Sequence, residues 1–293
     1  MADFTILPRD VLRLTGEDRA AFLQGLVSND MRKVAADRAV FAAFLTPQGK
    51  FLHDFHITVL GDAWLIDCDP GRGADLLRRL RMYRLRSKVD LADVTADWVV
   101  AALPGDAGVA AAGLPAEAGA ARALADGIVH VDARLAALGA RALLPAATAP
   151  TTLAGLGLVE TDAAAWDRLR LALGVPDGSR DLVPDKTVLL EANYDDLNAI
   201  AWDKGCYMGQ ELTARTKYRG LLKKRLAPVL LDGPAPEPGA LILRDGREVG
   251  EMRSSRDGLG LALLRLEALE GGDAPLSSGD TAIRPAAPAW KAA

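Results

Sequence analysis

Cys206 lies in the segment of this chain that is richest in residue types able to do chemistry, KGCYMGQE at 204–211. Glycines at 205 and 209 bracket the cysteine and indicate a tight loop that leads into a helix from about Gly209. A thiol beside a helix N-terminus and next to Lys204 has a lowered pKa and gains thiolate character. The alternative is that Cys206 is a small buried apolar residue at a turn, as free cysteines often are.

A cationic stretch follows this cysteine directly. No acidic residue lies between Leu212 and Leu231, and the stretch contains the basic residues Arg215, Lys217, Arg219, Lys223, Lys224 and Arg225. Such a patch suits a ligand with carboxylate or phosphate groups, because guanidinium and ammonium groups form charge-assisted hydrogen bonds to oxyanions. The alternative is a solvated basic face. A second basic run, at 72–88, alternates with Leu and Met and predicts the wet side of an amphipathic helix.

The histidines favour an acid–base pair over a metal site. His53 and His56 lie three apart in a predicted strand, where side chains alternate, so they point to opposite faces and make a poor chelate. Asp54 shares a face with His56, and a carboxylate–imidazole pair can move protons. The alternative for Asp54 is a place on the partly polar side of the strand. Trp166, at the start of a predicted helix, is either a core residue or a platform for ring stacking.

Composition excludes several classes of protein. With 293 residues, 50% of them hydrophobic, the chain is long enough for two or three domains with cores. Its two cysteines cannot form a disulfide framework or the four-thiolate site of an iron–sulfur cluster, so we expect no stably bound metal. The net charge of −4 argues against nucleic-acid or membrane partners. Because the N-terminal residues resemble no targeting signal, we expect a cytoplasmic location.

Alternating short strands and amphipathic helices predict an α+β fold. Two strands, at 39–45 and 51–60, are joined by a Pro-x-Gly turn that indicates a hairpin. From about 96 to 150 the chain becomes rich in Ala, Gly and Pro, a composition that small domains can use in helices. We interpret this stretch as globular, with little information in its side chains. The last 68 residues, 226–293, contain short strands and an Asp-Gly hairpin turn at 245–246, which predict a separate small β-domain.

The octet at 204–211 resembles the signature of the YgfZ/Iba-type proteins, which act in iron–sulfur cluster assembly and share the folate-binding fold of the glycine-cleavage aminomethyltransferase. The resemblance spans about 7–232 and is most similar to the mitochondrial-type branch. Further blocks that match lie at 14–18 (LTGED), 22–25 (FLQG), 45–50 (LTPQGK), 83–89 (YRLRSKV), 174–176 (GVP), 191–193 (EAN) and 212–226.

The resemblance implies an α+β fold in which two ferredoxin-like lobes, within 1–225, surround a central channel that a C-terminal β-barrel, 226–293, closes. It implies that Cys206 lies at this channel as nucleophile or as transient metal or sulfur ligand, and that Lys204 tunes its thiolate. It also implies that Asp54 hydrogen-bonds the ligand. The remaining expected ligand contacts are stacking by Trp166, loop shaping by Tyr207, Gln210 and Glu211, and attraction of glutamate carboxylates by Arg215 and Arg225.

The implied function is assembly or repair of [4Fe-4S] proteins with bound tetrahydrofolate. The implied partners are A-type iron–sulfur carrier proteins and [4Fe-4S] client enzymes, because one thiol cannot complete a cluster's ligands. The alternative is a folate-dependent aminomethyl or one-carbon transferase, with Asp54 as acid–base and Cys206 as a structural residue. In the aminomethyltransferases a Glu contacts the pterin where this chain has Ala172, which weakens that alternative.

Overall fold

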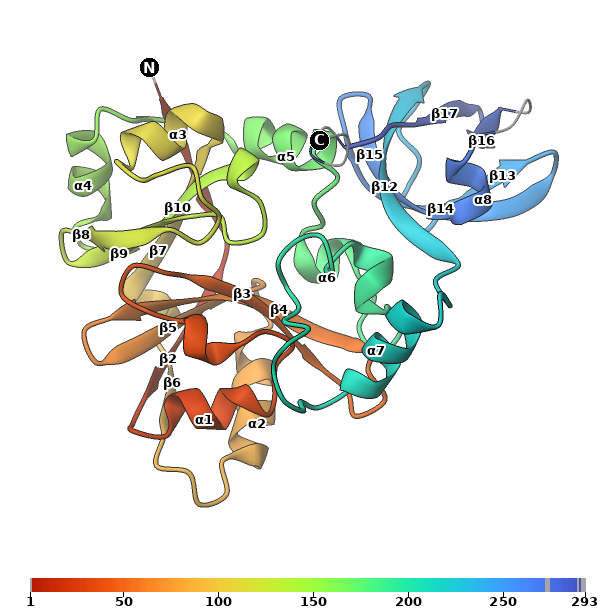
Figure 1. The fold of residues 1–293 in the computed structure, drawn as a ribbon. Helices are drawn as coiled ribbons and strands as arrows, with labels where there is room; N and C mark the ends of the chain where they lie inside the picture. The colour runs from red at the N-terminus through yellow and green to blue at the C-terminus, as the bar shows by residue number, and fades with distance from the viewer. Residues whose placement is uncertain (1, 272–274, 289, 291–293) are drawn as a thin grey trace.

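The computed structural model describes residues 2–271, 275–288 and 290. A five-stranded antiparallel sheet, here the first sheet, has the order β3-β4-β5-β2-β6 (Figure 1). Helices α1 (Arg19–Gln24) and α2 (Gly73–Tyr83) bury Phe22, Leu23, Leu76 and Leu80 in one hydrophobic cluster with it. The strands of the first sheet are β2 (Asp10–Thr15), β3 (Val40–Leu45), β4 (Phe51–Leu60), β5 (Ala63–Cys68) and β6 (Asp90–Asp93).

The predicted hairpin is confirmed and forms β3 and β4. Both strands are buried along almost their whole length, as their runs of apolar residues require. The turn closes with a hydrogen bond from the Thr46 amide to the Lys50 carbonyl, 2.8 Å long. Gly49 adopts a φ of +82°, which a residue with a Cβ seldom tolerates. The backbone of this turn contacts Gly209.

A six-stranded sheet, the second sheet, has the order β11-β1-β7-β10-β9-β8, with only the β1–β11 pair parallel. One face packs with helices α3 (Gly105–Ala111) and α4 (Ala149–Gly155). The other meets the first sheet through a cluster that includes Leu65 and Leu143. The strands are β1 (Asp3–Leu7), β7 (Trp98–Pro104), β8 (Ala121–Leu124), β9 (Gly127–Val131), β10 (Gly139–Pro145) and β11 (Val159–Glu160).

The Ala-rich segment, 96–150, supplies strands β7, β8, β9 and β10 of the second sheet as well as α3 and the start of α4. Ala101, Ala102, Ala140 and Ala142 lie on adjacent strands with no exposed surface. Alanine favours helices in isolation, but a sheet covered on both faces accepts small side chains wherever neighbouring layers approach closely. Tertiary burial overrides the intrinsic preference here.

The chain from 163 to 223 crosses between the sheets and the C-terminal part. Helix α5 (Ala163–Ala172) carries Trp166, and the short helix α6 (Gly178–Asp181) follows it. Helix α7 (Gln210–Tyr218) begins where the sequence predicts a helix after Gly209. Single-turn 3₁₀ helices lie at Met31–Lys33, Thr95–Asp97, Ala136–Leu138 and Leu189–Ala192.

The C-terminal part is a closed barrel with the order β12-β15-β14-β13-β16-β17, which confirms the α+β fold with a terminal barrel (Figure 1). Asp245 and Gly246, with φ values of +50° and +73°, form the predicted hairpin turn. The barrel elements are β12 (Lys224–Asp232), β13 (Leu241–Arg244), β14 (Arg247–Arg256), β15 (Leu259–Arg265), α8 (Leu266–Leu269), β16 (Leu276–Ser278) and β17 (Thr281–Pro285).

Candidate functional site

Cys206 is exposed at the tip of a loop whose two flanks are buried. Lys204 and Tyr207 have only 5% and 7% of their surface exposed, while Gly205 and Cys206 lie in solvent. We call residues 203–209 the thiol loop. The alternative of a buried apolar Cys206 is excluded, because the thiol is accessible to a reaction partner. That alternative does describe Cys68, which is fully buried in β5 and whose thiol pKa is raised by burial.

Lys204 fastens the first flank of the thiol loop to the end of α1. Its ammonium donates hydrogen bonds to the carbonyls of Gln24, Val27 and Asn29 at 2.8, 2.7 and 2.7 Å. An ammonium has three donors, and these contacts use all of them. These contacts turn the charge of Lys204 toward carbonyls at the end of α1 and just after it. Tuning of the Cys206 thiolate by Lys204 stays a prediction. Burial lowers the pKa of Lys204 to about 8.

Two glycines fix the other flank. A Cβ on Gly209 would lie 2.5 Å from the Thr46 carbonyl oxygen and 2.9 Å from the Cα of Gly49. A Cβ on Gly49 would lie 2.7 Å from the Gly209 carbonyl oxygen. The two backbones therefore touch directly, and the β3–β4 turn supports the start of α7. The Met208 amide adds a hydrogen bond to the Gly25 carbonyl, 3.0 Å long.

The remaining residues of the octet serve the loop and the helix in different ways. The Gln210 side chain accepts a hydrogen bond from the Tyr207 amide at 3.3 Å, which closes the turn before α7. The Tyr207 ring is buried 5.1 Å from the Lys204 ammonium, and burial raises its phenol pKa to about 12. Glu211 is exposed, and its carboxylate lies 3.7 Å from Arg215. Tyr207 and Gln210 thus contact each other in the turn before α7, while Glu211 faces solvent.

Asp54 lies far from solvent on the face of β4 that it shares with His56. Its carboxylate accepts a hydrogen bond from the Tyr194 hydroxyl. Burial, reinforced by the charge of Asp69, raises the pKa of Asp54 to about 7. His53 points to the other face, where it lies 2.9 Å from Asp75, so the predicted alternation of these side chains is confirmed. The two histidines cannot chelate one ion.

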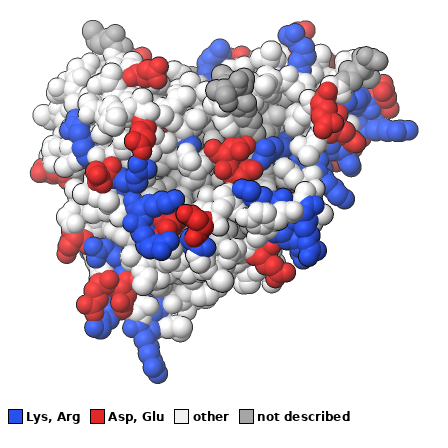
Figure 2. All heavy atoms as spheres, in the orientation of Figure 1, with Lys and Arg blue, Asp and Glu red and all other residues white. Residues whose placement is uncertain are grey.

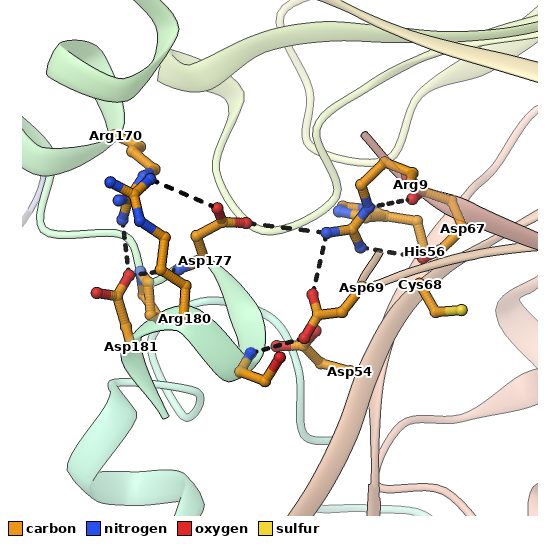
Figure 3. Close-up of polar contacts among 12 residues, drawn as sticks. Arg9, Asp54, His56, Asp67, Cys68, Asp69, Arg170, Asp177, Arg180 and Asp181 are labelled. Atoms are coloured by element: carbon orange, nitrogen blue, oxygen red, sulfur yellow. Dashed lines mark hydrogen bonds and ion pairs between the residues drawn. The ribbon is translucent and has the colours of Figure 1, made fainter. Parts of the chain in front are cut away.

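A chain of alternating charges connects the sheets with α5, α6 and the barrel. Arg141 bridges Asp67 at 2.6 Å and Asp132 at 2.9 Å, and Arg9 bonds the same Asp67 at 2.5 Å. Figure 3 shows Arg9 turned toward Asp67 and Asp69 on one side and toward Asp177 on the other. The chain continues through Arg180, Asp167, Arg256, Arg170, Asp181 and Ser254. It neutralises the buried charges and ties the parts of the molecule together.

Trp166 lies at the edge of a pocket of about 150 Å³. The indole is 6% exposed, packs in the central hydrophobic cluster and has the Arg141 guanidinium 5.7 Å from its ring centre. It is thus mainly a core residue with one edge on the pocket. Cys206 is not part of the pocket wall, so the expected channel shared by Trp166 and Cys206 is not found there. The other lining residues are Leu7, Pro8, Arg9, Pro70, Ala163, Asp167, Asp177, Arg180 and Arg256.

Arg225 and Ala172 also differ from their expected settings. The Arg225 guanidinium bonds Asp195 at 2.6 Å and lies 3.3 Å from Asp196, so its charge is already matched and does not await a ligand carboxylate. Ala172 ends α5 in an exposed position away from the pocket wall. Arg215, in contrast, is half-exposed on α7.

Sequence reasoning missed Tyr194, Arg141 and Asp132, which hold the buried polar centre. Arg141 and Tyr194 are among the largest fully buried side chains of the described residues. Arg141 and Asp132 stand in a stretch whose composition carries little signal. Tyr194 directly follows the 191–193 block, and that adjacency is the one signal that could have singled it out.

The fold defines the class of protein. The structure aligns with the glycine cleavage system aminomethyltransferase T of Bartonella henselae with a TM-score of 0.77 and 17% identity, over 97% of this chain and 84% of that one. At this identity the likeness concerns the fold alone. Residues 223–293 match the model of the CAF17 C-terminal β-barrel domain. The chain therefore has an aminomethyltransferase-like fold with a CAF17-type barrel.

Sequence relatives identify the family. The human mitochondrial iron–sulfur cluster assembly factor IBA57 is 37% identical, over 92% of this chain and 79% of that protein. The mouse protein of the same name is 32% identical, over 92% and 78%. This chain belongs to the IBA57 family of iron–sulfur cluster assembly factors. Its relatives are mitochondrial by name, as is the Aspergillus fumigatus homologue, so the expectation of a cytoplasmic location is wrong.

Among the described residues, no helix is long and apolar enough to cross a membrane. Nor do those residues place three or more His, Cys, Asp or Glu side chains together in a way that could hold a metal ion.

Proposed function

We propose that this chain assists the maturation of [4Fe-4S] proteins by presenting Cys206 as a thiolate ligand to a cluster whose other ligands come from an A-type carrier protein. The observation that carries the proposal is the exposed thiol on a loop held at both flanks. One thiolate supplies one of the four ligands that a cluster usually needs, so the partner must supply the others. The family supports this role, because its members are named as assembly factors.

The loop's construction suits temporary ligation. Lys204 and Tyr207 hold the flanks in the protein, so the thiol is presented without a large ordering cost on encounter. Cys206 itself stays in solvent, where a cluster can be received and released. The cluster is the cargo of this step, and client enzymes that need [4Fe-4S] clusters are its recipients.

Replacement of Cys206 by Ala in a deletion strain tests the proposal. We expect loss of [4Fe-4S] enzyme activity and, with the purified protein, loss of the shared-cluster absorption that appears when wild type is mixed with a cluster-loaded A-type carrier. Cys68→Ala is the matched control, since it removes the other thiol of the chain from a buried strand. Full support of maturation by the Cys206→Ala variant would overturn the proposal.

Tetrahydrofolate binding at the Trp166 pocket is the second part of the proposal. The indole edge can meet a flat ring. Arg180 and Arg256 both bond Asp167, but each is partly exposed and keeps further guanidinium donors that can bond a carboxylate. The volume of about 150 Å³ is smaller than the 300–1,000 Å³ or so usual for a whole ligand of this size. The lining residues thus fit one end of a folate, either the ring beside Trp166 or a carboxylate beside the arginines.

Titration calorimetry with tetrahydrofolate tests this part separately. We expect heat of binding with wild type and a much weaker signal with Arg180→Ala/Arg256→Ala, which keeps the hydrophobic cluster and the bond of Asp167 to Arg170. Trp166→Ala is informative only if its unfolding transition is intact, because the indole is part of the central cluster. Absence of heat with wild type would refute folate binding and leave the proposed role of Cys206 untouched.

Two observations favour assembly over a folate-dependent aminomethyl or one-carbon transferase. Asp54, the acid–base residue of that alternative, does not line the Trp166 pocket and is closed off by Tyr194. Ala172 offers no carboxylate for a pterin ring.

A further inference from the structure

The surface beside the thiol loop combines unmatched positive charge with exposed apolar side chains. Helix α7 and the turn after it expose a set of side chains that we call the α7 face, over which Figure 2 shows basic side chains gathered. The α7 face consists of Arg215, Lys217, Tyr218, Arg219, Leu221 and Lys223.

The charges of the α7 face have little pairing with carboxylates among the described residues. No carboxylate among the described residues lies within 4 Å of Lys217, Arg219 or Lys223. Arg215 has only a 3.7 Å contact with Glu211, a side chain that is 90% exposed. Arg225 differs sharply, because it bonds Asp195 at 2.6 Å, while Lys224 has a 3.8 Å contact with Glu248. An unpaired cluster of this kind attracts an acidic surface during encounter.

The apolar part of the α7 face is also unusual for a solvated helix. Tyr218 is 71% exposed and Leu221 is 50% exposed, although both are large apolar side chains. The Tyr218 ring meets Trp202 edge-on at 6.2 Å, and the Lys217 ammonium lies 3.7 Å from the centre of that same indole ring. Trp202 therefore orders one cation and one aromatic ring of the face before any partner arrives.

A groove of about 230 Å³ runs along the same helix. Leu221 and Leu222 supply apolar wall, and Arg215 and Lys223 flank it with charge. An apolar slot between cations fits an apolar side chain that is neighboured by carboxylates. Arrangements of aromatic and arginine residues around such slots are typical of binding hot spots between proteins.

We propose that the α7 face docks an acidic surface of the cluster-carrying partner protein and so brings its ligands to Cys206 at the other end of α7. The inference rests on the proposed function for the identity of that partner. Nucleic acid is the less suitable occupant, because the chain carries a net charge of −4 and Glu191 and Glu211 border the face. A protein surface tolerates such acids by local complementarity.

Binding of an A-type carrier to charge-reversed variants tests this docking surface. We expect Lys217→Glu/Arg219→Glu to raise the Kd at least tenfold in 0.1 M salt, with a much smaller effect in 0.5 M salt, because salt screens exposed charges. The matched control, Arg84→Glu/Arg86→Glu, makes the same change of net charge on the exposed segment after α2, and we expect its Kd to stay within twofold. Tyr218→Ala is expected to weaken binding equally at both salt concentrations.

Three results would overturn the docking proposal: no binding by wild type, equal weakening by the two double variants, or competition by a single-stranded oligonucleotide at equal affinity. Cys206→Ala separates it from the proposed function. We expect this variant to bind the carrier with unchanged Kd while forming no shared cluster. Conversely, if Lys217→Glu/Arg219→Glu binds normally while wild type still forms the shared cluster, docking fails and the role of Cys206 stands.

Discussion

At the scale of single residues, burial decides what each polar side chain of this protein does. Cys206 and Cys68 have the same chemistry, yet one thiol is in solvent and the other is sealed inside a strand. Lys204 lies in the thiol loop and Lys217 lies in α7 just after it, and only Lys217 keeps its charge on the surface. Asp54 shows the consequence for protonation most clearly, because it is buried without a cation bonded to it.

Replacing Asp54 by Asn tests this protonation. The pKa of Asp54 is raised from 3.8 to about 7 in the folded protein. The unfolded chain therefore loses this proton at lower pH than the folded protein does, so the free energy of unfolding falls as the pH rises from 3.8 to about 7 and stays level above that. We expect Asp54→Asn, whose amide oxygen still accepts from Tyr194, to gain stability over wild type across that interval, by on the order of 4 kcal/mol at most. Urea unfolding from pH 4 to 8 measures it, with the exposed Asp62→Asn as control. A stability difference that is constant with pH would contradict the raised pKa.

At the scale of elements, the β3–β4 turn and α1 are the supports of the thiol loop. These elements lie far from 203–209 in sequence. They meet it through backbone contacts and through backbone carbonyls that accept from Lys204, and no local sequence pattern predicts these contacts. Gly49 and Gly209 belong to two separated motif blocks and turn out to be one contact. The positive φ values and the close approach of the two backbones explain why both positions require glycine, which neither segment shows by itself.

Gly209→Ala tests the importance of that contact. The alanine would have to adopt a φ of +80°, and its methyl group would lie 2.5 Å from a carbonyl oxygen. We therefore expect a loss of about 2 kcal/mol in the free energy of unfolding, or a displaced loop. Gly205→Ala is the matched control in the same loop, because its Cβ would meet no atom within 4 Å. Thermal unfolding and the rate of Cys206 labelling by a thiol reagent report both effects. Equal behaviour of the two variants would show that the glycine contact does not hold the loop.

At the scale of the whole molecule, the charged chain joins the same parts that the central hydrophobic cluster joins. It runs from Asp132, directly after β9, through Asp67 in the first sheet, to Asp167 on α5 and Arg256 in the barrel. Buried ion pairs add little net stability compared with apolar packing, but breaking one leaves an uncompensated charge. The network therefore selects one arrangement of sheets and barrel over alternatives.

Arg141→Met tests the network. Arg141 is 2% exposed and bonds two aspartates, so its removal leaves buried carboxylates under-paired and is expected to cost about 3–5 kcal/mol in the free energy of unfolding. Arg78→Met removes a surface pair with Asp75 and is expected to cost about 1 kcal/mol or less. Urea unfolding of the two variants compares them. Similar losses would mean that the buried pairs matter no more than a surface pair.

The sequence by itself determined the elements with strong local signals: the hairpin at β3 and β4, the helix after Gly209, the terminal barrel and the prominence of Cys206. Periodicity, turn residues and glycine spacing act over a few residues, so they can be read along the chain. Only the tertiary structure decided that the Ala-rich segment supplies β7, β8, β9 and β10, that Lys204 faces carbonyls, that Arg225 is already paired and that Cys206 does not line the pocket at Trp166. Those outcomes depend on burial and on partners far away in sequence, which local patterns do not encode.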